Sequence, residues 1–314
     1  MKDVGIIIEA DNGKISATHF GMITLARAPE TRLSAFVFGA KANTVKQDLE
    51  SIGIARIFDV SLEVAGQDNP VVRAQAMANA VRELEIEAVF ALSHAQGRDL
   101  LPRIAALLDA PLVMDCVGVD LDQGLAWTSQ YSGKTMATFK VTGDVLMFGV
   151  RPNAVEPVPA KVAAEILTYD ADHLVSRGLR VIETAAADPS ANTSLAEADV
   201  IIAGGRGMGS GENFALLYQC AEKLNAVVGA SRVAVDAGWV PYALQVGQTG
   251  EKVSPRVYIA CGISGSVQHL AGMKTTQMVI AINTDDTAAI MSNCDYFVVG
   301  DALEIVPALT RHLE

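Results

Sequence analysis

The chain has 314 residues, with 24 Lys and Arg against 36 Asp and Glu, which gives a formal net charge of −12. Half of the residues are hydrophobic and only 19% are charged, a balance that excludes an intrinsically disordered chain. The acidity argues against a nucleic-acid partner, because such partners select basic patches. It leaves room for a phosphate-bearing cofactor in a local site, and the length predicts about two domains.

The sequence carries no sign of export or membrane insertion. The apolar stretch at residues 4–8 is too short for a signal peptide, and no stretch approaches the roughly 18 apolar residues that span a bilayer. The four cysteines form no CxxC pair, and the five histidines show no metal-ligand spacing. We therefore expect no disulfide framework, no metal and a cytoplasmic location.

Apolar runs alternate with helical patterns in the first half of the chain. The runs at residues 4–9, 34–38, 88–92 and 111–114 predict buried strands. Apolar residues recur at helical spacing over residues 77–84 and 101–108. This alternation is typical of βαβ units and predicts a parallel sheet covered by helices.

The pattern changes between about residues 120 and 150. The runs 137–141 and 145–150 are separated by glycines and predict antiparallel strands and turns. The proline-rich segment 151–161 predicts an extended connector, and residues 179–184 predict one more strand. The small, polar segment 185–192 predicts a domain boundary near residue 187, so the expected domains are residues 1–187 and 188–314.

The second half is more regular. Five runs predict strands at residues 199–203, 226–229, 256–261, 278–283 and 296–299. Helical segments are expected at residues 212–225, from Ser231, after residue 262 and at 301–313. This order predicts a doubly wound sheet, in which ligands bind beyond the carboxyl ends of the strands.

Three loops that are rich in Gly, Ser and Thr follow these strands, at residues 204–211, 246–250 and 262–269. Glycines let backbone N–H groups approach a ligand, a following helix N-terminus favours an anion, and Arg206 adds a cation. For each loop alone, a turn without a ligand is the alternative, since none reads G-x-G-x-x-G. Together they predict an extended cofactor site, and the chain has no Walker A or GxSxG motif that would indicate catalytic residues.

Several motifs occur in a fixed order along the second half: GGRG, GASR, QVGQTG, YIACGISGSVQHLAGM and IAIN. With the run GRDLLPR at residues 97–103, they resemble the α subunit of electron-transfer flavoproteins over essentially the whole chain. The resemblance implies a heterodimer with a β subunit that holds AMP or a second FAD. It implies an N-terminal α/β domain with a parallel sheet plus a few antiparallel strands, and a C-terminal doubly wound FAD-binding domain.

The resemblance also implies roles for individual residues. Arg232 matches the arginine against the isoalloxazine, Thr249 a hydroxyl near N5, and His269 a group near the C2 carbonyl oxygen. A cation and a donor there would favour the negative charge of a reduced flavin and raise its potential. The segment from Ser264 to His269 matches the pyrophosphate-binding segment, and Asn283 and Asp301 match adenosine-side positions. The full set of expected FAD contacts is Arg206, Ser231, Arg232, Val246, Gly247, Gln248, Thr249, Ser264, Gly265, Ser266, Val267, Gln268, His269, Asn283 and Asp301.

The function that the resemblance implies is electron transfer without substrate chemistry. The carrier would accept electrons from flavin dehydrogenases of the acyl-CoA type, as in fatty acid β-oxidation. It would pass them to a quinone-linked oxidoreductase of the membrane without inserting there itself. Two alternatives stay open: an electron-bifurcating complex that oxidises NADH with a second FAD in the β subunit, and a nucleotide-binding regulatory domain without flavin.

Overall fold

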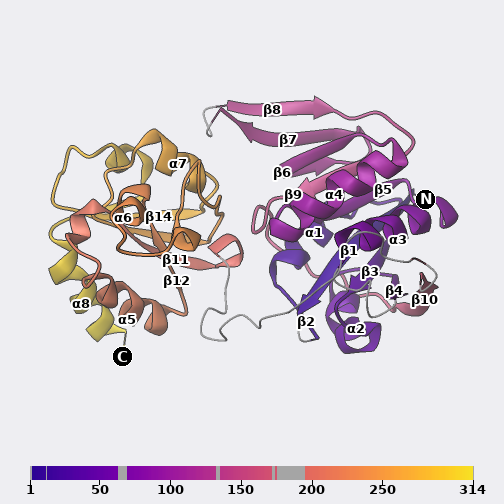
Figure 1. Ribbon diagram of the computed structural model, residues 1–314, viewed down its shortest axis with the longest axis horizontal. Coiled ribbons are helices and arrows are strands. Elements are labelled where there is room, and N and C mark those ends of the chain that lie inside the picture. Colours follow the sequence, from indigo (N-terminus) through magenta and orange to yellow (C-terminus); the bar gives the residue numbers. More distant parts are fainter. Residues whose placement is uncertain are drawn as a thin grey trace. The chain divides into compact units, whose positions relative to one another are not determined.

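The computed structural model describes residues 2–11, 13–62, 69–131, 135–171, 174 and 195–313. These residues form two compact units, each built on its own sheet (Figure 1). The predicted boundary near residue 187, the strand expected at 179–184 and the segment 185–192 all lie outside the described residues. The position of the boundary therefore stays a prediction.

The first unit alternates strands and helices up to a run of strands without helices. Its elements are β1 (Lys2–Asp11), β2 (Lys14–Ile15), α1 (Thr18–Ala26), β3 (Thr31–Phe38), α2 (Ala42–Ser51), β4 (Arg56–Ser61), α3 (Pro70–Glu83), β5 (Ala88–Leu92), α4 (Ala95–Leu108), β6 (Leu112–Asp120), β7 (Leu125–Gln130), β8 (Thr135–Lys140), β9 (Leu146–Val150) and β10 (Glu165–Asp170).

The described strands of this unit form one sheet in the order β10-β4-β3-β1-β5-β9-β6-β7-β8, with β2 attached to β1. Strands β10 through β6 pair in parallel, whereas β7 pairs antiparallel with β6. Successive side chains of a strand point to opposite faces, so Ile6 and Ile8 pack in one core with α1 and α2. Ile7 packs in the other core with α3 and α4. The predicted parallel sheet covered by helices is confirmed.

The strand at 146–150 corrects one prediction. We expected the run 145–150 to be antiparallel, but β9 pairs in parallel with both β5 and β6. Met147 and Phe148 of β9 are fully buried, because the strand lies inside the sheet with both faces covered. Such strands read as continuous apolar runs, and this signal outweighs the neighbouring glycines that suggested turns.

Several elements of the first unit did not stand out in the sequence, namely α1, α2, β4 and β10. Strand β4 mixes apolar residues with Arg56 and Asp59, and Arg56 forms a 2.7 Å ion pair with Asp3 of β1. A strand that carries a partly buried ion pair lacks the apolar run by which strands are recognised. The connector at 151–161 has no helix or strand, as predicted.

The second unit contains the five strands that the sequence predicted. Its elements are η3 (Leu195–Glu197), β11 (Val200–Gly204), η4 (Arg206–Met208), α5 (Phe214–Leu224), β12 (Val227–Ala230), α6 (Arg232–Asp236), η5 (Tyr242–Leu244), β13 (Val257–Cys261), α7 (Val267–Met273), β14 (Met278–Asn283), η6 (Ala289–Asn293), β15 (Tyr296–Val299) and α8 (Ala302–His312), where η marks a 3-10 helix.

All the strand pairs of the second sheet are parallel, in the order β12-β11-β13-β14-β15. The chain moves from β11 to β12 on one side and then returns to place β13 on the other side. Helices α5 and α8 contribute Phe214 and Val306 to the core on one face, and α7 contributes Met273 to the core on the other. This is the predicted doubly wound arrangement, and its topological switch point lies between β11 and β13.

Two further features concern the described residues of both units. No helix of the described residues is long and apolar enough to cross a membrane. Cys261 is fully buried at the end of β13, and burial raises the pKa of its thiol.

His19 of α1 provides a test of how α1 packs in the first unit. Its side chain is almost completely buried, and burial, with a smaller contribution from His94, lowers its pKa to about 4. The unfolded chain therefore binds more protons than the folded chain between pH 6.5 and 4, so the free energy of unfolding falls as the pH falls through this window.

We expect His19→Gln to remove this dependence. The stability difference between the parent chain and the variant should then shift by about 3 kcal/mol from pH 7 to pH 4, since one pKa unit corresponds to about 1.4 kcal/mol. Urea titrations at several pH values measure it. A stability difference that stays constant with pH contradicts the prediction.

Candidate functional site

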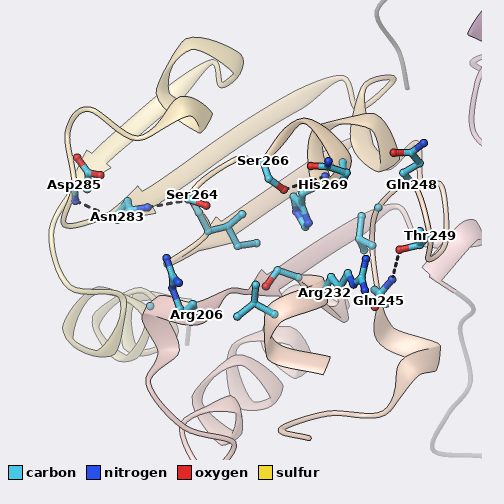
Figure 2. Close-up of a pocket in the computed structure, with 18 residues that line it drawn as sticks. Arg206, Arg232, Gln245, Gln248, Thr249, Ser264, Ser266, His269, Asn283 and Asp285 are labelled. Carbon is cyan, nitrogen blue, oxygen red and sulfur yellow. Dashed lines mark hydrogen bonds between the residues drawn. The ribbon is translucent and has the colours of Figure 1, made fainter. Parts of the chain in front are cut away.

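A cavity of about 480 Å³ opens in the second unit, where β11, β13 and β14 end. Its volume is within the range of ligand pockets in proteins, and its place matches the switch point of the sheet. Figure 2 shows Asn283 and Asp285 at one end and Gln248 and Thr249 at the other, so the site is extended. The lining residues are Arg206, Gly207, Ser231, Arg232, Val233, Gln245, Val246, Gly247, Gln248, Thr249, Gly262, Ile263, Ser264, Ser266, Gln268, His269, Asn283 and Asp285.

Twelve of the fifteen residues that the sequence singled out line this cavity. The other three lie outside its lining. Gly265 and Val267 alternate with lining residues of the same loop, and the Val267 side chain is exposed. Asp301 caps α8, where its carboxylate accepts a 2.9 Å bond from the Leu303 N–H, and it follows β15, two strands away from the switch point.

The first glycine-rich loop contributes less than its composition suggested. Of residues 204–211, only Arg206 and Gly207 line the cavity, because a single 3-10 turn follows β11 and α5 begins only at Phe214. The Gly207 N–H donates to the Gly262 carbonyl at 3.0 Å. A Cβ on either glycine would lie 2.7 Å from the Cα of the other. These glycines therefore bring two loop backbones together rather than opening a helix.

Three hydrogen bonds hold residues 246–249 of the second loop in place. The Val246 N–H donates to the Ala230 carbonyl at 2.9 Å, and the Gln248 N–H donates to the Gln268 carbonyl at 2.8 Å. Gln245 Nε2 donates to Thr249 Oγ1 at 3.0 Å. The Thr249 hydroxyl is thus oriented at the cavity wall by a buried amide.

The third loop, residues 262–269, is fixed to the strand beside it. Asn283, at the end of β14, donates from Nδ2 to the Ile263 carbonyl at 3.0 Å. The Ser264 carbonyl accepts a 3.1 Å bond from the Ile290 N–H, and Ser266 caps α7. The Asn283 side chain therefore shapes the cavity through the backbone as well as lining it.

The charges at the cavity favour an anion. Arg206 and Arg232 are exposed and line the same side of the site in Figure 2. Arg232 Nε lies 3.2 Å from Asp236 Oδ2, a surface pair that contributes little stability and leaves the guanidinium available. Hydrogen bonds from Thr287 lower the pKa of Asp285, so the lining carries two positive charges and one negative charge.

Two polar atoms of the lining are buried and have no hydrogen-bond partner among the described residues, Ser231 Oγ and His269 Nδ1. Ser231 is the N-cap residue of α6, yet its side chain makes no capping bond. Burial lowers the pKa of His269 to about 4, and the Val246 backbone offsets only part of this effect. Buried polar atoms are rarely left unpaired, so both are candidates for ligand contacts.

Six lining residues were not among the predicted contacts. Gly207, Gly262 and Ile263 lie inside loops that the sequence had singled out, and Gln245, Val233 and Asp285 each lie one or two positions from a predicted contact. Extending each motif by two residues would have found all six. The side-chain bond from Gln245 to Thr249 has no signal in a single sequence.

The comparisons with known proteins agree with this architecture. Residues 4–174 match the model of the electron transfer flavoprotein domain, and residues 194–274 match that of the electron transfer flavoprotein FAD-binding domain. The second match contains all the lining residues except Asn283 and Asp285. The class of protein that the fold and the site define is therefore an electron transfer flavoprotein.

Relatives identify the subunit. The chain is 34% identical to the electron transfer flavoprotein subunit alpha of Thermoanaerobacterium thermosaccharolyticum, over 100% of the chain and 98% of the relative. It is 33% identical to the Bacillus subtilis subunit alpha, with the same coverage. It is 35% identical to a probable mitochondrial subunit alpha of Caenorhabditis elegans, over 98% of the chain and 92% of the relative. The chain belongs to the family of electron transfer flavoprotein α subunits.

The contact between α7 and the second loop gives a test of the site geometry. A Cβ on Gly272 would lie 2.4 Å from the Gly247 nitrogen, so Gly272→Ala must push the loop away. We expect a loss of about 1–3 kcal/mol in stability and faster amide exchange at Gln248, whose N–H bond to Gln268 depends on the loop position. Hydrogen exchange and urea denaturation measure the two effects.

Gly238→Ala is the matched control, because a Cβ there meets nothing within 4 Å. Its only cost is the strain of a side chain at the left-handed φ of +73°. It should cost about 1 kcal/mol and leave the exchange of Gln248 unchanged. Equal exchange at Gln248 in the two variants would show that α7 does not hold the loop.

Proposed function

We propose that the cavity binds FAD and that the chain acts as the FAD-binding subunit of an electron carrier, completed by a β subunit. The match of residues 194–274 to the FAD-binding domain supports this proposal most directly. Bound FAD supplies reversible electron transfer at its isoalloxazine ring. The chain's own residues would bind it, orient it and set its potential.

The residues present fit such a ligand. Arg206 and Arg232 can offset the charge of a pyrophosphate. Ser231 Oγ and His269 Nδ1 are two buried polar atoms that make no hydrogen bond of ordinary geometry within the described residues. The close approach of Gly207 to Gly262 brings backbone groups to the cavity wall. The extended site, from Asn283 to Thr249, suits a dinucleotide better than a single phosphate.

The lining fits a carrier better than a catalyst of substrate chemistry. Arginines do not release protons in proteins, hydrogen bonds from Thr287 keep Asp285 ionised, and burial keeps His269 neutral. None of these three kinds of group is poised to exchange a proton near neutral pH. This supports electron transfer as the role of the site.

We infer the donor and acceptor from the family resemblance. The donors would be flavin dehydrogenases of the acyl-CoA type, and the acceptor a quinone-linked oxidoreductase of the membrane. The N-terminal unit would serve mainly to dock the β subunit, and the expected adenosine-side role of Asp301 stays a prediction because this residue does not line the cavity.

Cofactor analysis tests the proposal. Co-expression with the β subunit should give a heterodimer with one FAD and one AMP, whereas the isolated chain should retain FAD poorly because the partner completes the site. Flavin and nucleotide quantitation after denaturation measures both. Two FAD per heterodimer would favour the electron-bifurcating alternative. A colourless complex that cannot be reconstituted with FAD would overturn the proposal.

Ser231→Ala tests the site itself. If the unpartnered hydroxyl binds the cofactor, its loss should weaken FAD binding about tenfold, which corresponds to about 1.4 kcal/mol. The FAD-free protein should be as stable as the parent or more stable, since removing an unsatisfied buried hydroxyl carries no penalty. Fluorescence titration of the heterodimer with FAD and thermal denaturation measure the two quantities.

Ser210→Ala is the control, because Ser210 lies in the glycine-rich loop but outside the cavity lining. It should leave FAD affinity unchanged. Parent-like affinity in Ser231→Ala would remove this residue from the proposed contacts.

A further inference from the structure

One residue behind the cavity, Tyr258, is not among the residues assigned to the site but contacts His269, which is. Tyr258, the second residue of β13, is fully buried, and its hydroxyl oxygen lies 3.0 Å from Nε2 of His269. The two rings meet edge to face, with centroids 6.0 Å apart. Tyr258 does not line the cavity, whereas His269 does, so any effect of Tyr258 on a ligand must pass through the imidazole.

The hydrogen bonds available to Tyr258 and His269 indicate whether the hydroxyl oxygen or Nε2 is the donor. The only hydrogen bond of the Tyr258 hydroxyl within the described chain is the one to His269. If Nε2–H donated to the hydroxyl, the phenolic proton and the Nδ1 lone pair would both be buried without partners. If the hydroxyl donates to Nε2, only the N–H at Nδ1 is left without a partner of ordinary geometry among the described residues, and the Val246 backbone favours a proton on the ring. Leaving a buried polar group unpaired costs about 1–3 kcal/mol, so the second arrangement is favoured.

The surroundings agree with this arrangement. Burial raises the pKa of Tyr258 well above its usual value, so the phenol keeps the proton that it donates. Burial also keeps His269 neutral, so the ring carries one proton and has one acceptor nitrogen. The Val246 backbone, which favours a proton on the ring, belongs to the loop at the cavity wall.

We propose that Tyr258 is a positioning residue that fixes His269 as its Nδ1–H tautomer and thereby holds a neutral hydrogen-bond donor at the wall of the cavity. The N–H at Nδ1 has no partner of ordinary geometry among the described residues. An acceptor on a bound cofactor can provide one. This consequence for the cofactor rests on the proposed function, whereas the tautomer itself does not.

The tautomer can be measured without any cofactor. In the full chain labelled with ¹⁵N-histidine, two-bond ¹⁵N–¹H correlation at pH 7 distinguishes a protonated Nδ1 from a protonated Nε2. The signal of His269 is assigned by its loss in His269→Ala. We expect Nδ1–H in the parent chain and a shift toward Nε2–H, the form that free histidine prefers in water, in Tyr258→Phe.

Tyr218→Phe, on the exposed side of α5, is the control and should leave the His269 signal unchanged. An Nε2–H form in the parent chain overturns the proposal even if Tyr258→Phe does not fold. If His269 keeps the Nδ1–H form of the parent chain in Tyr258→Phe, the proposal is overturned as well.

The second readout is the potential of FAD in the heterodimer. A donor that faces the cofactor favours its reduced, more negative form, so Tyr258→Phe should shift the first-electron equilibrium toward the oxidised form about tenfold, or about 59 mV. His269→Ala should lower the potential as well. The double variant, Tyr258→Phe with His269→Ala, should lower it no further than His269→Ala alone. Additive shifts would show that Tyr258 acts independently of His269. Failure of the parent heterodimer to bind FAD would contradict the proposed function, while the histidine spectrum would still decide the tautomer.

Discussion

The site depends on the close approach of two backbones at the switch point of the second sheet. Gly207 and Gly262 follow β11 and β13, and their loops are joined by a 3.0 Å bond from the Gly207 N–H to the Gly262 carbonyl. A side chain on either residue would lie within 2.7 Å of the other Cα. The approach is possible because neither residue has a side chain. It lies at the switch point of the sheet, where ligands bind in the crevice at the carboxyl ends of the strands.

The remaining parts of the cavity are attached to this junction. Residues 246–249 bind the end of β12 through Ala230 and the segment 262–269 through Gln268, and Asn283 ties β14 to Ile263. Each loop is thus held by backbone hydrogen bonds, and few side chains are needed to maintain the shape. Arg232, Ser231 and His269 line the cavity without being needed to hold its loops, which is the arrangement expected of a preorganised cofactor site.

Much of this could be predicted from the sequence, for identifiable reasons. The five strands of the second sheet are apolar runs buried on both faces, and parallel strands give that signal clearly. The family motifs located twelve of the cavity residues. Where prediction failed, local pattern and tertiary context disagreed: β9 has glycines nearby but lies inside the sheet, and β4 carries Arg56, whose charge is compensated by Asp3 on β1.

The sequence by itself determined the class of fold, the family and the set of loops that could meet a cofactor, since each follows from short-range pattern or from motif order. The tertiary structure decided which members of that set face one cavity. It excluded Asp301 from the lining, because β15 lies two strands from the switch point. It also brought Tyr258 to His269, because a strand residue and a helix residue meet only when the helix packs on the sheet, and no spacing in the chain encodes that contact.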